Sequence, residues 1–402
     1  MGIYEEILLA AREYEGEMRE NYRQLHKTAE SGMQLTKTTS FCREKLEKMG
    51  YFVKDVAGGL VCDAGKGARG VLLRADMDAL PVAEESGVDF VSENGRMHAC
   101  GHDMHTAMLL CAARLIKERE EKLPFAVRLC FQPGEETLSG AKAMIDGGLL
   151  SDFQADGAMM LHVLSGTDYE TGTVIIPPKG IGASGADFFR VTVKGKGCHG
   201  STPHLGRDPL LPLCHMIAAL SATVSREVPA GGGEVLTVGS VRAGEAANAI
   251  PEEGSFSGTL RSYSDEGRER LRERLVSVSQ GIGDAFGCSA RVEFTSGCPS
   301  FVNCHEVVEY CKELFLESVV IPEGTLGGGS EDFAYVSRLA PSVMLCLAAG
   351  KREEGYTYPL HSPKVRFDER ALVFGAAAYA AFALGMLRNT EGSVWNAPQD
   401  DR

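Results

Sequence analysis

Residues 97–105 read Met-His-Ala-Cys-Gly-His-Asp-Met-His, and the rest of the chain is organised around this stretch. Apolar side chains recur at helical spacing in the segment that follows, Thr106–Ile116, which predicts a helix. We expect Asp103 to be the N-cap of this helix, so that Cys100 and His102 lie in the loop before it. Thiolate and imidazole suit zinc and other first-row transition metals, and the Asp103 carboxylate can orient an imidazole from behind. Two ligands do not hold a metal, so a buried cysteine beside a helix cap is the simpler interpretation unless other segments supply more ligands.

Composition and charge narrow the class of protein. Of the 402 residues, 44% are hydrophobic and 24% are charged, as in an ordinary soluble globular protein, and the length suggests two or three domains. A net charge of -14 argues against nucleic acid or an anionic membrane surface as the partner, although a local arginine can still bind a small anion. The 12 cysteines include no Cys-x-x-Cys pair, so neither a disulfide framework nor a zinc ribbon is expected.

Neither terminal region has the pattern of a membrane or export signal. The sequence Met-Gly-Ile-Tyr-Glu-Glu at the start is acidic and has no apolar core, so we expect no signal peptide. The uncharged run Ala371–Leu387 is shorter than the ~20 residues of a membrane span and predicts a buried helix instead. We therefore expect a cytoplasmic protein.

Short apolar runs predict buried strands of a parallel sheet at residues 71–73, 126–131, 158–161 and 343–348. Helices are expected around them, with two amphipathic helices within residues 5–49 and another helix at 140–149. Strands that alternate with helices indicate an α/β sheet. Polar residues follow the ends of the first three strands, namely Asp76, Asp78, Glu135, Glu136 and His162. Because open α/β sheets bind ligands beyond the carboxyl ends of their strands, we expect these side chains to converge there.

The middle of the chain has a different order of elements. Residues 187–194, 235–241, 255–260 and 290–294 predict strands, and residues 209–226 and 265–286 predict helices. This β-α-β-β-α-β order is that of the ferredoxin-like fold. The predicted fold class is therefore α/β, with a discontinuous domain at 1–182 and 297–402 that has a central mixed sheet flanked by helices. A ferredoxin-like α+β domain is inserted at 183–296.

Five candidate metal ligands come from separate segments: Cys100, His102, Glu136, His162 and His361. Taken singly, each has a simpler interpretation, such as a surface glutamate, a hydrogen-bonded core histidine or an exposed loop histidine. Five ligands exceed the three or four of one zinc ion and suit two metals that share a ligand, for which a Cys100 thiolate is suitable. Since adjacent side chains diverge, one of Glu135 and Glu136 can bind metal while the other acts as a general base toward a metal-bound water. With no nucleotide-binding glycine motif in the chain, hydrolysis of an amide or peptide is favoured over redox chemistry.

Seven motifs, taken in order, resemble those of the M20 metallopeptidase family. Besides residues 97–105 they are R-A-D-M-D-A-L-P (74–81), F-Q-P-G-E-E (131–136), L-H-V (161–163), C-H-G-S-T-P-H (198–204), G-G-S-E-D-F (328–333) and L-H-S-P (360–363). The similarity spans roughly Gly50–Leu384 and is greatest to the amidohydrolase branch, which includes hippurate, N-acyl-amino-acid and auxin-conjugate hydrolases. It implies a catalytic domain with an inserted lid or dimerisation domain. It also implies two divalent metal ions per subunit (manganese, zinc or cobalt) and a homodimer formed through the lid.

The resemblance also implies roles for single residues. It makes the five candidates the metal ligands and Glu135 the general base, and it places Asp78, with less support Asp76, behind the ligands. Other branches of the family have a histidine ligand at the position of Asp76. This chain lacks that histidine, so Cys100 is expected to supply the ligand in its place. In the lid, His199 would stabilise the oxyanion from the partner subunit, and His204 has weaker support. Asn248 and Arg261 would hold the substrate carboxylate, and Gly329 and Ser330 would line the acyl pocket.

The expected reaction is hydrolysis of the amide bond of an N-acyl amino acid to a carboxylate and an amino acid. In it, a water held between the two metals is deprotonated by Glu135. Two alternatives stay open: a dipeptidase or aminopeptidase with the same metals, and a catalytically silent metal-binding protein. Residues 27–31 lack the Pro-Glu-Leu that the family has after the position of His26, which leaves the substrate analogy open.

Overall fold

The computed structural model describes residues 2–229, 231–321 and 329–389, and the chain divides into two compact units. Unit 1 comprises residues 1–182, 302–325 and 332–402, and unit 2 comprises residues 183–301 and 326–331. The sequence predicted residues 183–296 for this inserted unit. The unit continues farther along the chain, because its last strand does not stop at Phe294 but runs to Cys298.

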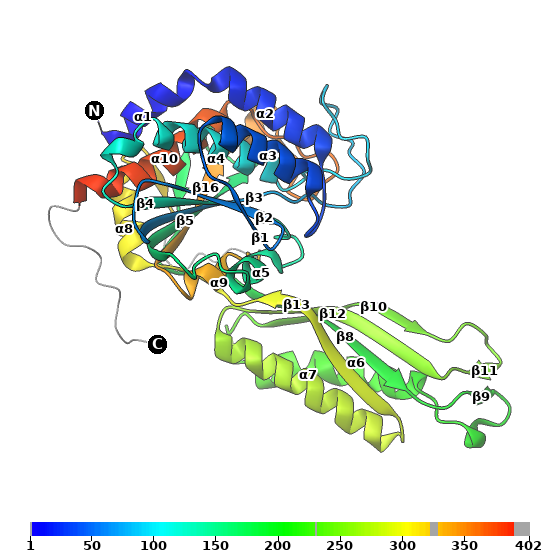
Figure 1. Cartoon of the computed structure of the whole chain (residues 1–402). Helices are drawn as coiled ribbons and strands as arrows, with labels where there is room; N and C mark the ends of the chain where they lie inside the picture. Colours follow the sequence, from blue (N-terminus) through cyan, green and yellow to red (C-terminus); the bar gives the residue numbers. More distant parts are fainter. Residues whose placement is uncertain (1, 230, 322–328, 390–402) are drawn as a thin grey trace. The chain divides into compact units, whose positions relative to one another are not determined.

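Unit 1 is built on an eight-stranded mixed sheet of order β1-β2-β4-β3-β5-β16-β6-β15 (Figure 1). The pairs β4–β3, β3–β5 and β5–β16 are parallel, so the middle of the sheet is the parallel part. Every residue of β4 is buried, as expected for a strand covered on both faces. The four predicted strands are confirmed. The bounds are β1 Lys54–Val56, β2 Gly59–Ala64, β3 Arg69–Asp76, β4 Ala126–Gln132, β5 Gln154–Leu164, β6 Val174–Ile176, β15 Val319–Val320 and β16 Ser342–Ala348.

Helices cover both faces of this sheet. In Figure 1, α2, α3 and α4 lie above it, and α5 and α9 lie below. The long helix α10 packs on α1 and α4, and nearly all of its described side chains are buried, which confirms the predicted buried helix. Among the described helices, none combines the length and apolar character that crossing a bilayer requires. The bounds are α1 Ile3–Arg12, α2 Glu15–Thr28, α3 Thr36–Lys48, α4 His102–Lys117, α5 Gly140–Asp146, α8 His305–Leu314, α9 Ala334–Ser337 and α10 Ala371–Asn389.

The prediction of two helices within residues 5–49 is wrong, because the structure has three. The missed break lies at residues 13–14, between α1 and α2. The buried residues Ile7, Ala11 and Met18 keep a helical spacing across this break. Apolar periodicity therefore did not reveal it.

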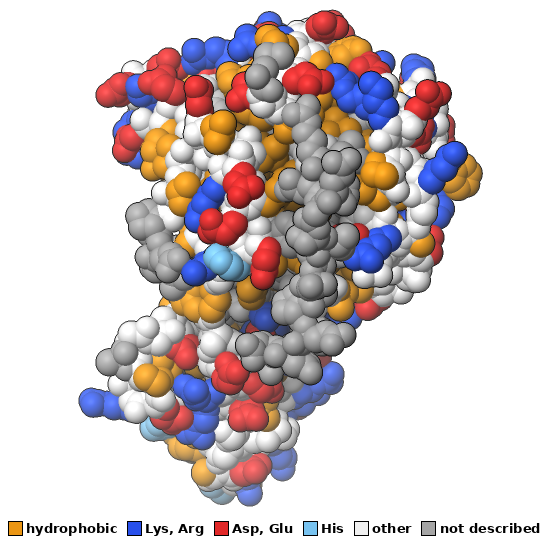
Figure 2. All heavy atoms as spheres, turned by 90° about the vertical axis from the view of Figure 1, so that its left-hand side faces the viewer, with side chains coloured by type: hydrophobic (Ala, Val, Ile, Leu, Met, Phe, Trp, Pro, Cys, Tyr) orange, Lys and Arg blue, Asp and Glu red, His pale blue; other side chains and the backbone are white. Residues whose placement is uncertain are grey.

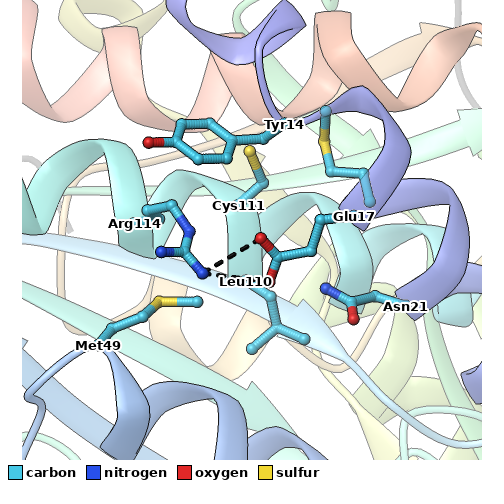
Figure 3. Close-up of a pocket in the computed structure, with 8 residues that line it drawn as sticks. Tyr14, Glu17, Asn21, Met49, Leu110, Cys111 and Arg114 are labelled. Atoms are coloured by element: carbon cyan, nitrogen blue, oxygen red, sulfur yellow. Dashed lines mark hydrogen bonds and ion pairs between the residues drawn. The ribbon is translucent and has the colours of Figure 1, made fainter.

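An ion pair joins α2 to the last turn of α4. Arg114 Nη2 lies 3.1 Å from Glu17 Oε1, beside Tyr14 and Cys111 (Figure 3). The cavity that these side chains line has a volume of about 10 Å³, which is the space of one water molecule. It is too small to hold a substrate, so this contact serves to dock α2 on α4.

Unit 2 contains a four-stranded antiparallel sheet of order β10-β12-β8-β13 (Figure 1). Its helices bury Leu213, Met216 and Leu271 in one core with Phe189 and Phe256 of the sheet. The order along the chain confirms the predicted β-α-β-β-α-β pattern. The bounds are β8 Gly185–Lys194, α6 Leu210–Glu227, β10 Val235–Ala243, β12 Glu253–Ser262, α7 Asp265–Ala285 and β13 Ser289–Cys298. The structure also has two short two-stranded sheets. One pairs β9 (Cys198–His199) with β11 (Ala249–Ile250), and the other pairs β7 (Gly180–Ala183) with β14 (Phe301–Asn303).

The net charge of -14 does not form one acidic area on the face drawn in Figure 2, where acidic and basic side chains are interspersed.

Candidate metal centre

The predicted ligands of unit 1 gather at the carboxyl edge of the parallel strands. β3 ends at Asp76 and β4 ends at Gln132, three residues before Glu135, while β5 carries His162 close to its end. Because these strands are parallel, their carboxyl ends lie at the same edge of the sheet. The first turn of α4 begins at the same edge, since Thr106 Oγ1 donates a hydrogen bond to the Asp76 carbonyl at 2.8 Å.

The structure brings all five candidate ligands together in two groups that share Cys100. Cys100, His102 and His162 form one group, and Cys100, Glu136 and His361 form the other. Within each group the ligand atoms all lie within 4.8 Å of one another. The Cys100 Sγ to His162 Nε2 distance is 3.4 Å, and the His361 Nε2 to Glu136 Oε1 distance is 3.6 Å. A sulfur atom common to both groups is the arrangement expected of a bridging ligand.

His102 lies in the helix and not in the loop before it, so the predicted position is wrong. α4 begins at His102, and its N-cap is Gly101, which has a φ of 86°. A side chain at Gly101 would meet Val163 Cγ2 at 2.3 Å, so both the space and the backbone angle require glycine. Asp103 is the second residue of α4 and therefore not its N-cap. The start of α4 was predicted wrongly because it depends on a glycine cap with a left-handed backbone, and apolar periodicity does not reveal such a cap.

A hydrogen bond occupies Nδ1 of His102 and leaves Nε2 available to the candidate metal centre. Nδ1 donates to the carbonyl oxygen of Asp78 at 2.8 Å, while Nε2 is buried and has no hydrogen-bond partner in the described part of the chain. Burial opposes protonation, but the Asp76 charge and the bond to Asp78 still raise the pKa of His102 well above its usual value. A cation at Nε2 would take the place of the proton there.

His162 was expected at the end of its strand, but β5 continues to Leu164, so His162 lies two residues before the strand ends. Its Nδ1 bonds to the Val163 carbonyl at 2.8 Å, so Nε2 is the nitrogen that faces Cys100. Burial lowers the pKa of His162 to about 3, which keeps the ring neutral and its lone pair available to a metal.

The two consecutive glutamates are held by one aspartate. Asp78 Oδ1 accepts the backbone N–H of Glu135 at 2.9 Å, and Asp78 Oδ2 accepts that of Glu136 at 3.2 Å. Burial raises the pKa of Glu136 to about 7, and its Oε1 atom is buried with no hydrogen-bond partner among the described residues. Glu135 Oε2 lies 4.0 Å from His102 Nε2, so the second carboxylate also faces the centre.

Backbone strain occurs in two of the loops that carry candidate ligands. His361 has a φ of 68°, and its N–H donates to the Ala99 carbonyl at 2.9 Å. Leu138, at the end of the glutamate turn, has a φ of 50°. Non-glycine residues in this region cost energy and are concentrated at functional sites, so both loops are held in place by their surroundings.

The donor set fits a pair of transition-metal ions. Burial raises the pKa of the Cys100 thiol to about 12, so the thiolate needs a nearby cation to form. Among the buried atoms without partners in the described residues, His102 Nε2 and Glu136 Oε1 belong to candidate ligands, and a bound cation would satisfy both. Thiolate, imidazole and carboxylate together suit zinc, cobalt or manganese.

Two buried residues behind the ligands were missed by sequence reasoning. His105 Nδ1 donates to Asp76 Oδ1 at 2.6 Å, and its Nε2 accepts the Val163 N–H at 2.8 Å, so neither nitrogen can bind a metal. Arg74 Nη1 donates to Asp76 Oδ2 at 2.7 Å from a fully buried position. An arginine inside the apolar run 71–75 was the available signal, because a buried guanidinium requires a carboxylate partner.

The predicted substrate-binding residues belong to unit 2, whereas the five ligands belong to unit 1. The pairing of β9 with β11 sets His199 opposite Ala249, next to Asn248. The Ser201 N–H donates to His199 Nδ1 at 3.1 Å, so a neutral ring carries its proton on Nε2. Arg261 Nη1 donates to Ser330 Oγ, and among the described residues Arg261 pairs with no carboxylate.

The profile of peptidase family M20/M25/M40 matches residues 72–385 of the chain. An N-acetyl-L-cysteine deacetylase of Bacillus subtilis (strain 168) is 33% identical over 359 residues, which cover 87% of this chain and 83% of the relative. Thermostable carboxypeptidase 2 of Saccharolobus solfataricus is 33% identical over 396 residues, covering 96% and 99%. A hippurate hydrolase of Campylobacter jejuni is 31% identical over 398 residues, covering 96% and 100%.

Solved structures agree with these relatives. A protein from methicillin-resistant Staphylococcus aureus, described as an aminohydrolase, superposes with a TM-score of 0.84 at 31% identity, covering 95% of this chain and 99% of that one. A Bacillus subtilis peptidase of the M20 family, described as dinuclear and metal-binding, gives 0.75 at 27% identity, covering 94% and 99%.

Proposed function

From the premise that the chain belongs to peptidase family M20/M25/M40 and is a hydrolase of linear amide bonds, we propose that it cleaves N-acyl amino acids at a centre of two metal ions. The observation that carries the proposal is the pair of ligand groups that share Cys100, with Glu135 beside them. Relatives named for the removal of acyl groups from amino acids support the substrate class.

We assign the five gathered side chains as the ligands: Cys100, His102, Glu136, His162 and His361. Two bound divalent cations would polarise the acyl carbonyl and lower the pKa of a water molecule. The mixture of sulfur, nitrogen and oxygen donors is compatible with manganese, zinc or cobalt.

Glu135 is proposed to accept the proton of the attacking water and to return it to the leaving amine. Its backbone N–H is fixed by Asp78, and its side chain is only 9% exposed. The Oε2 atom of Glu135 lies 4.0 Å from His102 Nε2, and this position beside the candidate ligands supports the assignment.

His199 is proposed to donate a hydrogen bond to the oxyanion through its Nε2–H. The contact of Nδ1 with the Ser201 N–H supports this proton position, because the acceptor nitrogen of a neutral imidazole is already used. Arg261 and Asn248 are proposed to hold the substrate carboxylate. The lack of a carboxylate partner for Arg261 among the described residues supports that assignment.

A homodimer formed through unit 2 is proposed as the assembly. β10 is an edge strand of its sheet, and its residues Val235 and Val241 are 46% and 52% exposed. The neighbouring helix α6 exposes Leu211. An open strand edge beside apolar side chains invites pairing with a second copy. The variant Val241→Lys should turn a dimer into a monomer in light scattering, and a wild-type monomer would refute the proposal.

A peptidase is the second candidate, because a carboxypeptidase is as similar in sequence as the deacetylase. The deciding experiment compares N-acetyl and N-benzoyl amino acids with free dipeptides, using protein loaded in turn with manganese, zinc and cobalt. We expect hydrolysis of the N-acyl substrates, loss of activity in a chelator and recovery on adding metal. Preference for dipeptides would establish the second candidate, and bound metal without any hydrolysis would refute both. The cytoplasmic location stays a prediction for cell fractionation to test.

A further inference from the structure

A buried histidine of α2 lies between two carboxylates that come from different segments. His26 Nδ1 is 2.6 Å from Asp103 Oδ2, and His26 Nε2 is 2.9 Å from Glu84 Oε1. The His26 side chain is 4% exposed, and the two carboxylates are fully buried. None of these three residues is a candidate metal ligand. We call them the His26 cluster.

The charge state of the cluster follows from its geometry. An imidazole that donates to a carboxylate from each nitrogen must carry two protons and a positive charge. Burial alone lowers the pKa of His26, but the hydrogen bonds with Asp103 and Glu84 raise it to about 9. His26 is therefore a cation at neutral pH. Its charge compensates the negative charges of the two buried carboxylates, and removing one member of a buried ion pair is strongly unfavourable.

The cluster is connected to the metal centre through the first turn of α4. Asp103 is the residue directly after the candidate ligand His102. On one side, His105 and Thr106 fix this turn to Asp76 at the end of β3, at 2.6 and 2.8 Å. On the other side, the contact of Asp103 with His26 fixes it to α2. The direction of the His102 ring is therefore held from both sides.

The second carboxylate fixes the loop that leads into the cysteine ligand. Glu84 also accepts the Ser92 N–H at 2.8 Å. The same loop is closed by Leu80 and Met97, whose backbone groups bond at 3.0 Å, three residues before Cys100. His26 thus contacts two segments, one continuous with His102 and the other continuous with Cys100.

We propose that His26 is a positioning residue for the metal centre, which acts through Asp103 on His102 and through Glu84 on the loop before Cys100. The inference rests on the metal site of the proposed function. A merely structural role would be to dock α2, but the Arg114–Glu17 ion pair already does this farther along α4. Loss of His26 should therefore disturb the ligands more than the attachment of α2.

The test compares His26→Gln with Arg114→Gln, a matched control that weakens the same pair of helices away from the ligands. For each protein, we would measure the Co²⁺ affinity by titration, the visible spectrum of the Co²⁺-loaded form and the unfolding midpoint of the metal-free form. His26→Gln should bind Co²⁺ ~10–100-fold more weakly and show a changed spectrum, as for other residues that orient ligands. Arg114→Gln should lower the unfolding midpoint only.

Asp103→Asn is the second variant, because it keeps the shape of the side chain and removes its charge. It should lose part of the same affinity. Wild-type affinity and spectrum in whichever of the two variants folds would overturn the proposal. Because metal binding is measured apart from catalysis, a wild-type protein that binds Co²⁺ but cleaves no amide would refute the proposed reaction and leave this inference standing.

Discussion

The carboxylate of Asp78 lies 2.9 Å from the backbone nitrogen of Glu135, and its other oxygen lies 3.2 Å from that of Glu136. The backbone carbonyl of the same aspartate accepts a hydrogen bond from His102 at 2.8 Å. A single aspartate, two residues beyond the end of β3, therefore fixes the proposed base and two proposed ligands. This dependence on a single carboxylate leads to the first prediction.

Asp78→Asn should weaken Co²⁺ binding ~10–100-fold and slow hydrolysis, because an amide nitrogen would replace one of the two oxygens that accept backbone N–H groups. Isothermal titration and a rate assay would measure both effects. The control is Asp168→Asn, since the Asp168 side chain is 87% exposed. Equal affinity in the Asp78 variant and the control would show that the glutamate turn does not depend on this aspartate.

Cys100→Ser should reduce the binding of both metal ions, because the two ligand groups share this residue. A serine hydroxyl is a much poorer ligand than a thiolate for these metals. Elemental analysis of the purified protein would give the metal content per chain. The control is Cys111→Ala, because Cys111 is also a buried cysteine but lies within α4 and is not a candidate ligand. Full metal content in the serine variant would exclude a bridging role for the sulfur.

Arg261→Lys should raise KM for N-acyl amino acids about 10–100-fold with a smaller change in kcat. Lysine cannot hold a carboxylate with two parallel hydrogen bonds, and a bond to a charged group contributes about 1.5–3 kcal/mol. Steady-state kinetics would separate the two constants. Arg291→Lys is the control, because the Arg291 side chain is 78% exposed. If kcat fell and KM did not change, Arg261 would act on the reaction and not on the carboxylate.

The contribution of His26 to stability should depend on pH. Its pKa rises from 6.5 to about 9 on folding, so the folded form holds the proton more tightly. The contribution is therefore complete below pH 6.5 and is lost as the pH rises through about 9. It amounts to about 3 kcal/mol at most. Urea unfolding of metal-free wild type and His26→Gln would measure it, and a difference in unfolding free energy that stays constant over this range would contradict the assignment.

Much of the fold was predictable because its strands are short apolar runs bounded by turns. The candidate ligands could be selected from the sequence because metal binding uses a few residue types, and histidine and cysteine are uncommon in this chain. The start of α4 was not predictable, because it depends on the left-handed backbone of Gly101 and on the close approach of this glycine to Val163. The third N-terminal helix was missed because apolar spacing continues across the break.

The buried polar partners were beyond the reach of the sequence for another reason. His105 and His26 each bond to residues that are distant in the chain and that the fold brings to them, and periodicity gives no information on such pairs. His26 and Asp103, for example, are 77 positions apart in the chain. Only the packing of α2 on α4 makes them neighbours.

The most direct test of the proposed chemistry is the hydrolysis rate of Glu135→Gln, measured together with its metal content. The substitution keeps the backbone contact with Asp78 and removes only the basic carboxylate. We predict that both metal ions remain bound and that the rate on an N-acyl amino acid falls ~10²–10⁴-fold. A wild-type rate at full metal content would contradict the account.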